Sequence, residues 1–195
     1  MTEHDALGER GRALEEEYFR KRDRELIEKM RQAAKADRAR GELDEKTGLH
    51  DPALLKELQD LGFTPDTVVL LPLVPMLEVA WAEGGITPAE RDLLVRFARG
   101  RGVVDDSVAD QQLSAWMTNP PDSSVFVHAR RLTAALLADS AAQVTRGLTA
   151  DELVAYCEKI AAASGGILGL RLGSISLEEK SLLARIASDL KTRQS

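Results

Sequence analysis

The chain has 195 residues, of which 44% are apolar and 30% are charged, and this composition excludes a protein that is disordered throughout. Aromatic residues make up only 4%, while Ala, Leu, Arg and Glu are abundant, which favours helices packed through aliphatic side chains over β-sheets. The net charge of −6 argues against nucleic-acid binding by the whole molecule, and the single cysteine, Cys157, excludes an intrachain disulfide.

Near the N-terminus, residues 9–40 have the composition of one long charged helix, with acid-to-base pairs four residues apart such as Glu16 and Arg20. Phe19, Leu26 and Ala33 lie seven residues apart, and Ile27 and Met30 lie beside them. This thin apolar stripe is interrupted by charged residues, so it predicts a docking helix rather than a regular coiled coil. We expect a protein partner or a second copy of the chain to pack against this stripe and to contact Phe19, Leu26, Ile27 and Met30.

Residues 20–40 carry nine basic and four acidic side chains, which makes this part of the chain locally basic. No known DNA-binding or RNA-binding motif accompanies the charge, so we expect no nucleic-acid partner. A peripheral contact with a membrane surface stays open as an alternative.

A polar segment rich in turn residues, 41–48, is interpreted as a linker between this arm and the rest of the chain. The predicted organisation is a charged helical arm with its linker over residues 1–47 and a helical domain over residues 48–195. Asp51 and Pro52 predict an N-cap and first turn of a short helix that Gly62 ends.

The most apolar stretch, residues 67–83, contains Pro72, Pro75 and Glu78, so it predicts a buried helix with a kink or a 3₁₀ turn rather than a membrane span. The polar first residues do not resemble a signal peptide, and together these features predict a cytoplasmic protein. Further helices are expected over residues 87–100, 105–118, 123–139, 149–163 and 176–191.

Two parts of this domain are similar in sequence. Residues 86–98 and 175–187 share six of thirteen identities, and both copies are preceded by a helix that ends in Gly-Gly. The second copy has eight additional residues, 167–174, between its glycines and the isoleucine. Each copy begins with a capping box, Thr87 with Glu90 and Ser176 with Glu179. We therefore predict an all-α, compact multi-helix bundle with an internal helix-pair duplication, whose Gly-Gly turns lie at one end.

The segment VAWAEGGITPAERDLLVRFARGRGV resembles the signature of the TerB-like (tellurite-resistance B) family, and a weaker likeness extends over residues 64–190. The resemblance implies an all-helical fold, a link to bacterial stress responses and a divalent-metal site formed by acidic residues. Carried over by position, those acids are Glu83 and Glu90. The chain departs from the pattern at Glu83, where Asp is usual, and at Ser164, where the second copy has no acid.

The first Gly-Gly turn matches the second half of an EF-hand calcium loop. Glu83 and Glu90 match positions 5 and 12, but Val79 and Trp81 would stand at positions 1 and 3 without side-chain oxygens. No cofactor is expected except a weakly bound calcium or magnesium ion, held by Glu83 and Glu90 with Glu78 completing the site. The alternative is that Glu90 caps its helix and Glu83 is solvated.

The glycine-rich segment of the second copy has three interpretations: a loop that folds onto the core, a docking surface, or a phosphate cradle. The residues concerned are Gly165, Gly166, Ile167, Leu168, Gly169, Leu170 and Arg171.

No arrangement of residues indicates catalysis. His128 is expected to be partly buried and Cys157 to be a small core residue. The leading hypothesis is therefore a non-enzymatic, stress-associated interaction module. The alternatives are a weak divalent-metal binder or sensor and an enzyme whose site is not visible in the sequence.

Overall fold

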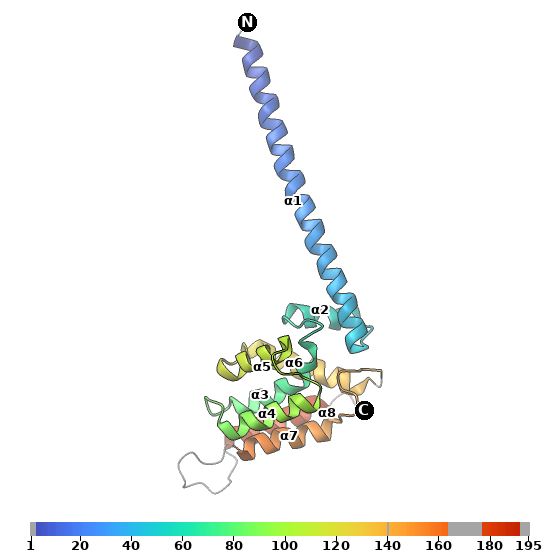
Figure 1. Ribbon diagram of the computed structural model, residues 1–195, viewed down its shortest axis with the longest axis vertical. Helices are drawn as coiled ribbons and strands as arrows, with labels where there is room; N and C mark the ends of the chain where they lie inside the picture. Colours follow the sequence, from blue (N-terminus) through green and yellow to red (C-terminus); the bar gives the residue numbers. More distant parts are fainter. Residues whose placement is uncertain (1–2, 140, 164–176, 192–195) are drawn as a thin grey trace. The chain divides into compact units, whose positions relative to one another are not determined.

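The computed structural model describes residues 3–139, 141–163 and 177–191, and every regular element within them is helical (Figure 1). The prediction of an all-α bundle is confirmed. The glycine-rich residues Gly165 to Arg171 and the capping residue Ser176 lie outside the described residues. Within the described residues, no helix combines the length and apolar character needed to cross a membrane. The elements, in chain order, are α1 (Glu3–Thr47), α2 (Pro52–Asp60), η1 (Val68–Leu73), α3 (Val74–Ala80), α4 (Pro88–Gly100), α5 (Val108–Thr118), α6 (Ser123–Ala138), α7 (Ala150–Ala163) and α8 (Leu177–Lys191).

Two compact units divide the chain, Met1–Gly41 and Glu42–Ser195. The first unit consists of most of α1, and the side chains of residues 16–37 are exposed. Local interactions accompany its helical backbone: Arg20 Nη2 lies 3.4 Å from Glu16 Oε2, and Gln32 Nε2 donates to Glu28 Oε1 at 3.2 Å. The predicted helix over 9–40 is therefore present and extends further at both ends.

The predicted linker over residues 41–48 is wrong, because α1 continues through Thr47. Glu, Leu and Lys all favour helix, and Leu43 is only 1% exposed within the core of the second unit. The helix ends at Gly48, where φ is +70° and an added Cβ would lie 2.6 Å from the carbonyl oxygen of Ala141. A side chain at this position would therefore meet both backbone strain and a clash.

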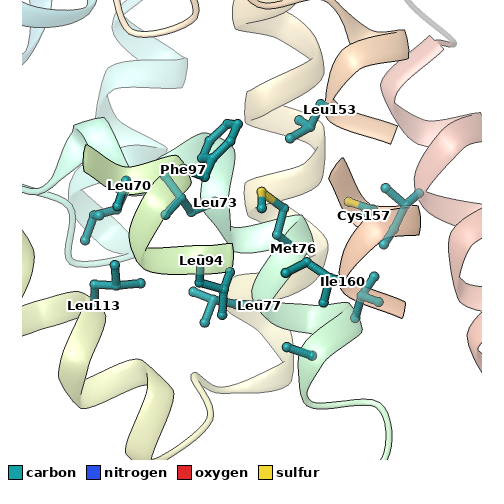
Figure 2. Packing of buried hydrophobic residues seen from close by; sticks show 14 of the residues in the cluster. Leu70, Leu73, Met76, Leu77, Leu94, Phe97, Leu113, Leu153, Cys157 and Ile160 are labelled. Carbon is teal, nitrogen blue, oxygen red and sulfur yellow. The ribbon is translucent and has the colours of Figure 1, made fainter. Parts of the chain in front are cut away.

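The second half of the apolar stretch forms the centre of the second unit. The predicted effect of the prolines is confirmed: Pro72 lies in the 3₁₀ helix η1, and the α-helix α3 begins after it. Six of the seven residues of α3 are buried, as expected of a helix that is hydrophobic on all sides. Figure 2 shows Met76 and Leu77 of α3 among side chains of α4 and α7, including Leu94, Cys157 and Ile160.

The two similar sequence segments form the helix pairs α3–α4 and α7–α8. The first helices of the pairs, α3 and α7, pack against each other, and α4 packs against α7 as α8 packs against α3. Matched positions also have matched burial: Leu94 and Leu183 are buried, and so are Phe97 and Ile186. This reciprocal packing is the arrangement that the predicted duplication requires.

The remaining helices complete the bundle. α6 packs against α3, α8 and η1, while α5 packs against η1. The predicted caps of α2 are present, since the Asp51 carboxylate accepts from Ala53 N at 2.8 Å and Gly62 follows with φ +84°. A second group of buried side chains, which includes Leu43, Leu58 and Leu132, joins the end of α1 and α2 to α6.

Candidate functional site

The capping box predicted at the start of α4 is confirmed. Thr87 Oγ1 accepts from the Glu90 backbone N–H at 3.3 Å, and Glu90 Oε2 accepts from the Thr87 backbone N–H at 2.7 Å. Pro88 lies in the first turn of the helix, where backbone N–H groups make no intrahelical hydrogen bond, so proline disrupts none. Glu90 thus has a structural role that is sufficient to explain an acid at this position.

Glu90 is also the centre of an acidic group. Its side chain and that of its counterpart in the second copy, Glu179, are each only 1% exposed. Burial raises the pKa of the Glu90 carboxyl, and the negative charges of Glu179 and Glu83 raise it further, against the lowering effect of the hydrogen bonds with Thr87. The first turns of α4 and α8 therefore lie near each other, as the predicted pairing of the two copies requires.

The third acid predicted for a metal site, Glu78, has a different partner. Both of its carboxylate oxygens accept from Arg130 Nη1, and Arg130 Nε donates to Asp189 at 2.8 Å. Arg130 is 4% exposed, so a cluster of one cation and two acids joins α3, α6 and α8 inside the bundle. Burial alone would lower the pKa of Arg130, but the two carboxylates raise it. The structure thus brings Glu83 and Glu90 together and commits Glu78 to an ion pair.

Within the described part of the chain, no three His, Cys, Asp or Glu side chains are grouped so that they could hold a metal ion. Cys157 is fully buried, and this burial, with the charges of Glu78 and Glu158, raises the pKa of its thiol to about 12. A thiol with this pKa stays protonated at neutral pH, as the predicted core role requires.

His128 is more exposed than expected: it lies at the surface, with its side chain 47% exposed. Its Nδ1 lies 2.8 Å from Glu57 Oε1, and Arg131 donates to the other oxygen of Glu57. Partial burial of Glu57 raises the pKa of its carboxyl, but the hydrogen bonds from Arg131 and His128 lower it, and the net effect is a lowered pKa. This surface group ties α2 to α6.

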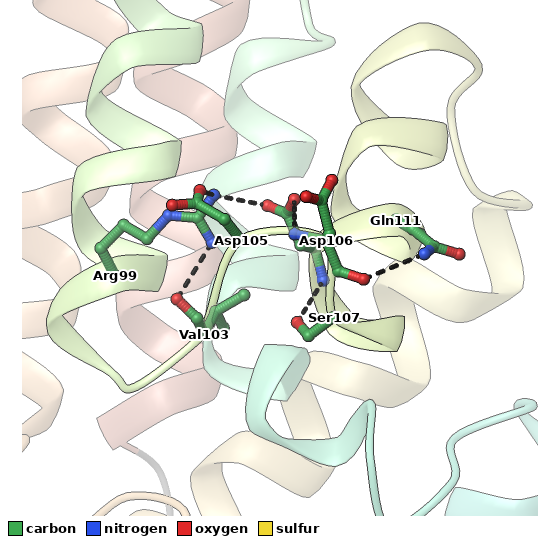
Figure 3. A network of polar contacts seen from close by, with 7 residues as sticks. Arg99, Val103, Asp105, Asp106, Ser107 and Gln111 are labelled. Atoms are coloured by element: carbon green, nitrogen blue, oxygen red, sulfur yellow. Dashed lines mark hydrogen bonds and ion pairs between the residues drawn. The ribbon is translucent and has the colours of Figure 1, made fainter.

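The connection between α4 and α5 is held by a polar network (Figure 3). Arg99 Nη1 donates to the carbonyl of Val103 at 3.0 Å, and Arg99 Nη2 contacts both Asp105 and Asp110. Asp106 has φ +58°, and its backbone N–H donates to Asp110 at 3.1 Å. The network holds Asp106 at a positive φ that glycine usually favours.

The predicted docking residues of α1 are exposed. The exposed fractions are 60% for Phe19, 56% for Leu26, 48% for Ile27 and 64% for Met30. Tyr18 adjoins them and is 57% exposed, with its ring 5.9 Å from that of Phe19 between centroids. Phe19, Leu26 and Met30 share one line along α1 at helical spacing, and Ile27 and Tyr18 flank it, so these residues form a thin apolar stripe that charged residues interrupt.

Sequence reasoning did not identify the Arg130 cluster or the Glu57 group. One signal was available for Arg130, since it lies four residues after Phe126 and four before Ala134 on the apolar face of α6. Its partners Glu78 and Asp189 are too distant in sequence for any spacing rule to join them.

Comparison with known proteins does not help to assign a function to these residues. No family model matches the chain, and neither does any curated protein or solved structure.

Proposed function

We propose that this protein is a non-enzymatic helical interaction module that associates through α1. The observation that carries the proposal is the exposed stripe of Phe19, Leu26, Ile27 and Met30 on a helix whose other described side chains are mostly charged. Complete burial of one large apolar side chain contributes about 1.5–3 kcal/mol. Several of these partly exposed side chains must therefore be buried together to offset the entropy cost of association. The bacterial stress-response setting enters the proposal through the resemblance to TerB-like proteins.

The charge along α1 favours a second copy of the chain as the occupant of the stripe. Residues 3–17 contain six acidic and two basic side chains, a net charge of −4, whereas residues 20–40 have nine basic and four acidic ones, a net charge of +5. In an antiparallel pair with its midpoint near Lys21, the acidic part of each helix faces the basic part of the other. A parallel pair would place like charges side by side.

A variant pair tests this proposal in the full-length protein. The stripe variant carries Phe19→Ser, Leu26→Ser and Met30→Ser, and the control carries Lys21→Ser, Glu28→Ser and Gln32→Ser on the opposite face, with no net charge change. Light scattering after size-exclusion chromatography should give a concentration-dependent dimer for the wild type and the control, and a monomer for the stripe variant.

A wild-type chain that stays monomeric at every concentration would contradict self-association. Capture of another protein from lysate by the wild type, lost in the stripe variant, would assign the stripe to that partner instead. Truncation is a poorer test if it reaches residue 46, because it removes Leu43 from the core of the second unit.

A second candidate function is weak binding of calcium or magnesium beside Glu90. The observation that favours it is the proximity of Glu83 to the buried Glu90; backbone carbonyls or water would have to supply the remaining ligands, because the described residues contain no group of three acids that could hold a metal ion. A divalent cation would offset the repulsion among these carboxylates. Calorimetry should then show heat that is lost in Glu83→Gln and kept in the exposed control Glu158→Gln; absence of heat at millimolar concentration removes this candidate.

A further inference from the structure

Arg101, at the C-terminal end of α4, is a partly buried cation without an acidic partner among the described residues. Its Nη1 donates to the carbonyl of Arg146 at 3.0 Å and its Nη2 to the carbonyl of Val144. Its Nε is buried and has no hydrogen-bond partner. Burial lowers the pKa of this guanidinium, and no carboxylate charge acts against that effect. Among the described residues, the hydrogen-bond partners of this partly exposed guanidinium are backbone carbonyls.

Arg101 lines a hollow of about 400 Å³ between α4 and α7. Arg96 and Lys159 also line it, and among the described residues Glu152 is the one acid in its wall. One carboxylate oxygen of Glu152, Oε2, accepts from the backbone N–H and from the hydroxyl of Thr149, at 2.8 and 3.0 Å. Three cations and one acid give the hollow a net charge of +2, and that acid is engaged at the start of α7.

The rest of the wall is apolar and aromatic. Phe97 and Tyr156 meet edge to face with centroids 4.6 Å apart, and Leu93 and Leu148 lie around them. Lys159 Nζ lies 4.9 Å from the centre of the Tyr156 ring, so a charged group and an aromatic surface are adjacent. The volume lies within the range of small-molecule sites, in which apolar walls accompany a few convergent polar groups.

A second hollow on Arg101, of about 650 Å³, does not share this charge. Its wall contains Lys46 and Arg101 but also Glu45 and Asp66, so its formal charges cancel. Of these two hollows, the one between α4 and α7 is the one whose described wall has a net positive charge.

We propose that the hollow between α4 and α7 binds a small anion that carries an aromatic group. The anionic oxygens would lie against Arg96, Arg101 and Lys159, and the ring against Phe97 and Tyr156. A carboxylate and a phosphate monoester both meet this description, since both present oxygen acceptors to cationic donors. The site is independent of association through α1.

Nuclear magnetic resonance of the ¹⁵N-labelled full-length protein tests the site with three probes: phenylacetate, phenyl phosphate and, as the neutral match, benzyl alcohol. We expect shift changes centred on Gly147, Leu148 and Tyr156 with at least one anion, and weaker changes with the alcohol. Arg96→Gln and Lys159→Gln should each weaken binding about threefold and their combination about tenfold. The matched control is Lys180→Gln, which removes the same charge from an exposed position on α8.

The four variants alter exposed side chains, so their spectra should otherwise overlay that of the wild type. No shift changes with either anion up to about 10 mM would overturn the proposal. So would equal binding of benzyl alcohol, equal affinity in the Arg96 and Lys159 double variant, or shift changes centred elsewhere in the protein.

Discussion

Two helices of this protein, α1 and α3, are stabilised in opposite ways. On α1, the large apolar side chains Phe19, Leu26 and Met30 are 56–64% exposed, and local polar pairs accompany the helix. On α3, Met76 and Leu77 are at most 1% exposed, and the helix is too short to be stable without its neighbours. The comparison teaches that large apolar residues on a helix are buried in the fold of one unit and are left exposed in the other.

The largest effect is expected where a buried charge loses its partner. Arg130→Ala leaves Glu78 inside the bundle without its cation, and breaking such a pair costs about 3–5 kcal/mol. Urea unfolding should show this loss in the free energy of unfolding. The neighbouring Arg131→Ala is the control, because Arg131 is 54% exposed and its ion pair with Glu57 contributes about 1 kcal/mol or less. Equal effects of the two substitutions would contradict the assignment of Arg130 to the core.

Leucine truncation tests the comparison between the two units directly. Leu77→Ala should lower the free energy of unfolding of the second unit by about 2–5 kcal/mol, because Leu77 is fully buried. Leu26→Ala should change it by about 0.5 kcal/mol or less at concentrations where the protein is monomeric. The unfolding midpoints at low protein concentration measure both, and similar losses would mean that the Leu26 side chain belongs to a core.

A smaller effect is expected at the start of α4. Thr87→Ala removes the acceptor for the Glu90 backbone N–H and should cost about 1 kcal/mol. Thr87→Ser keeps the hydroxyl and should cost less. If thermal unfolding ranks the two variants equally, the cap does not contribute in the way described.

The smallest effect concerns pH. The pKa of Glu90 is raised above its ordinary value of 4.5 in the folded protein, so the folded state holds more protons than the unfolded state between 4.5 and that raised pKa. The contribution of Glu90 to the free energy of unfolding therefore falls as pH rises through this window. Glu90→Gln should flatten the fall, and an unchanged pH profile would count against the crowding of Glu90 by Glu179 and Glu83.

Much of the fold was predictable because its signals are local. Asp51, Thr87 and the prolines at 72 and 75 act within one or two turns, and the structure has the caps and the 3₁₀ segment that they predict. The linker was wrongly predicted because polarity was given more weight than helix propensity, and the burial of Leu43 depends on helices far along the chain.

The candidate sites were less predictable, because they depend on contacts between distant residues. Glu83 and Glu90 could be paired from their spacing, but the addition of Glu179 depends on how the two copies pack. The partners of Glu78 and the backbone carbonyls around Arg101 have no signature in the sequence. His128 was misplaced because its neighbours on α6 are apolar, while Glu57 of α2 holds it at the surface.

Sedimentation equilibrium of the full-length chain at low and high salt tests the central proposal most directly. Antiparallel pairing of α1 brings opposite charges together, so the dimer should form at low salt and its dissociation constant should rise as salt screens the attraction. A dissociation constant that falls with added salt, or a monomer under both conditions, would contradict the account.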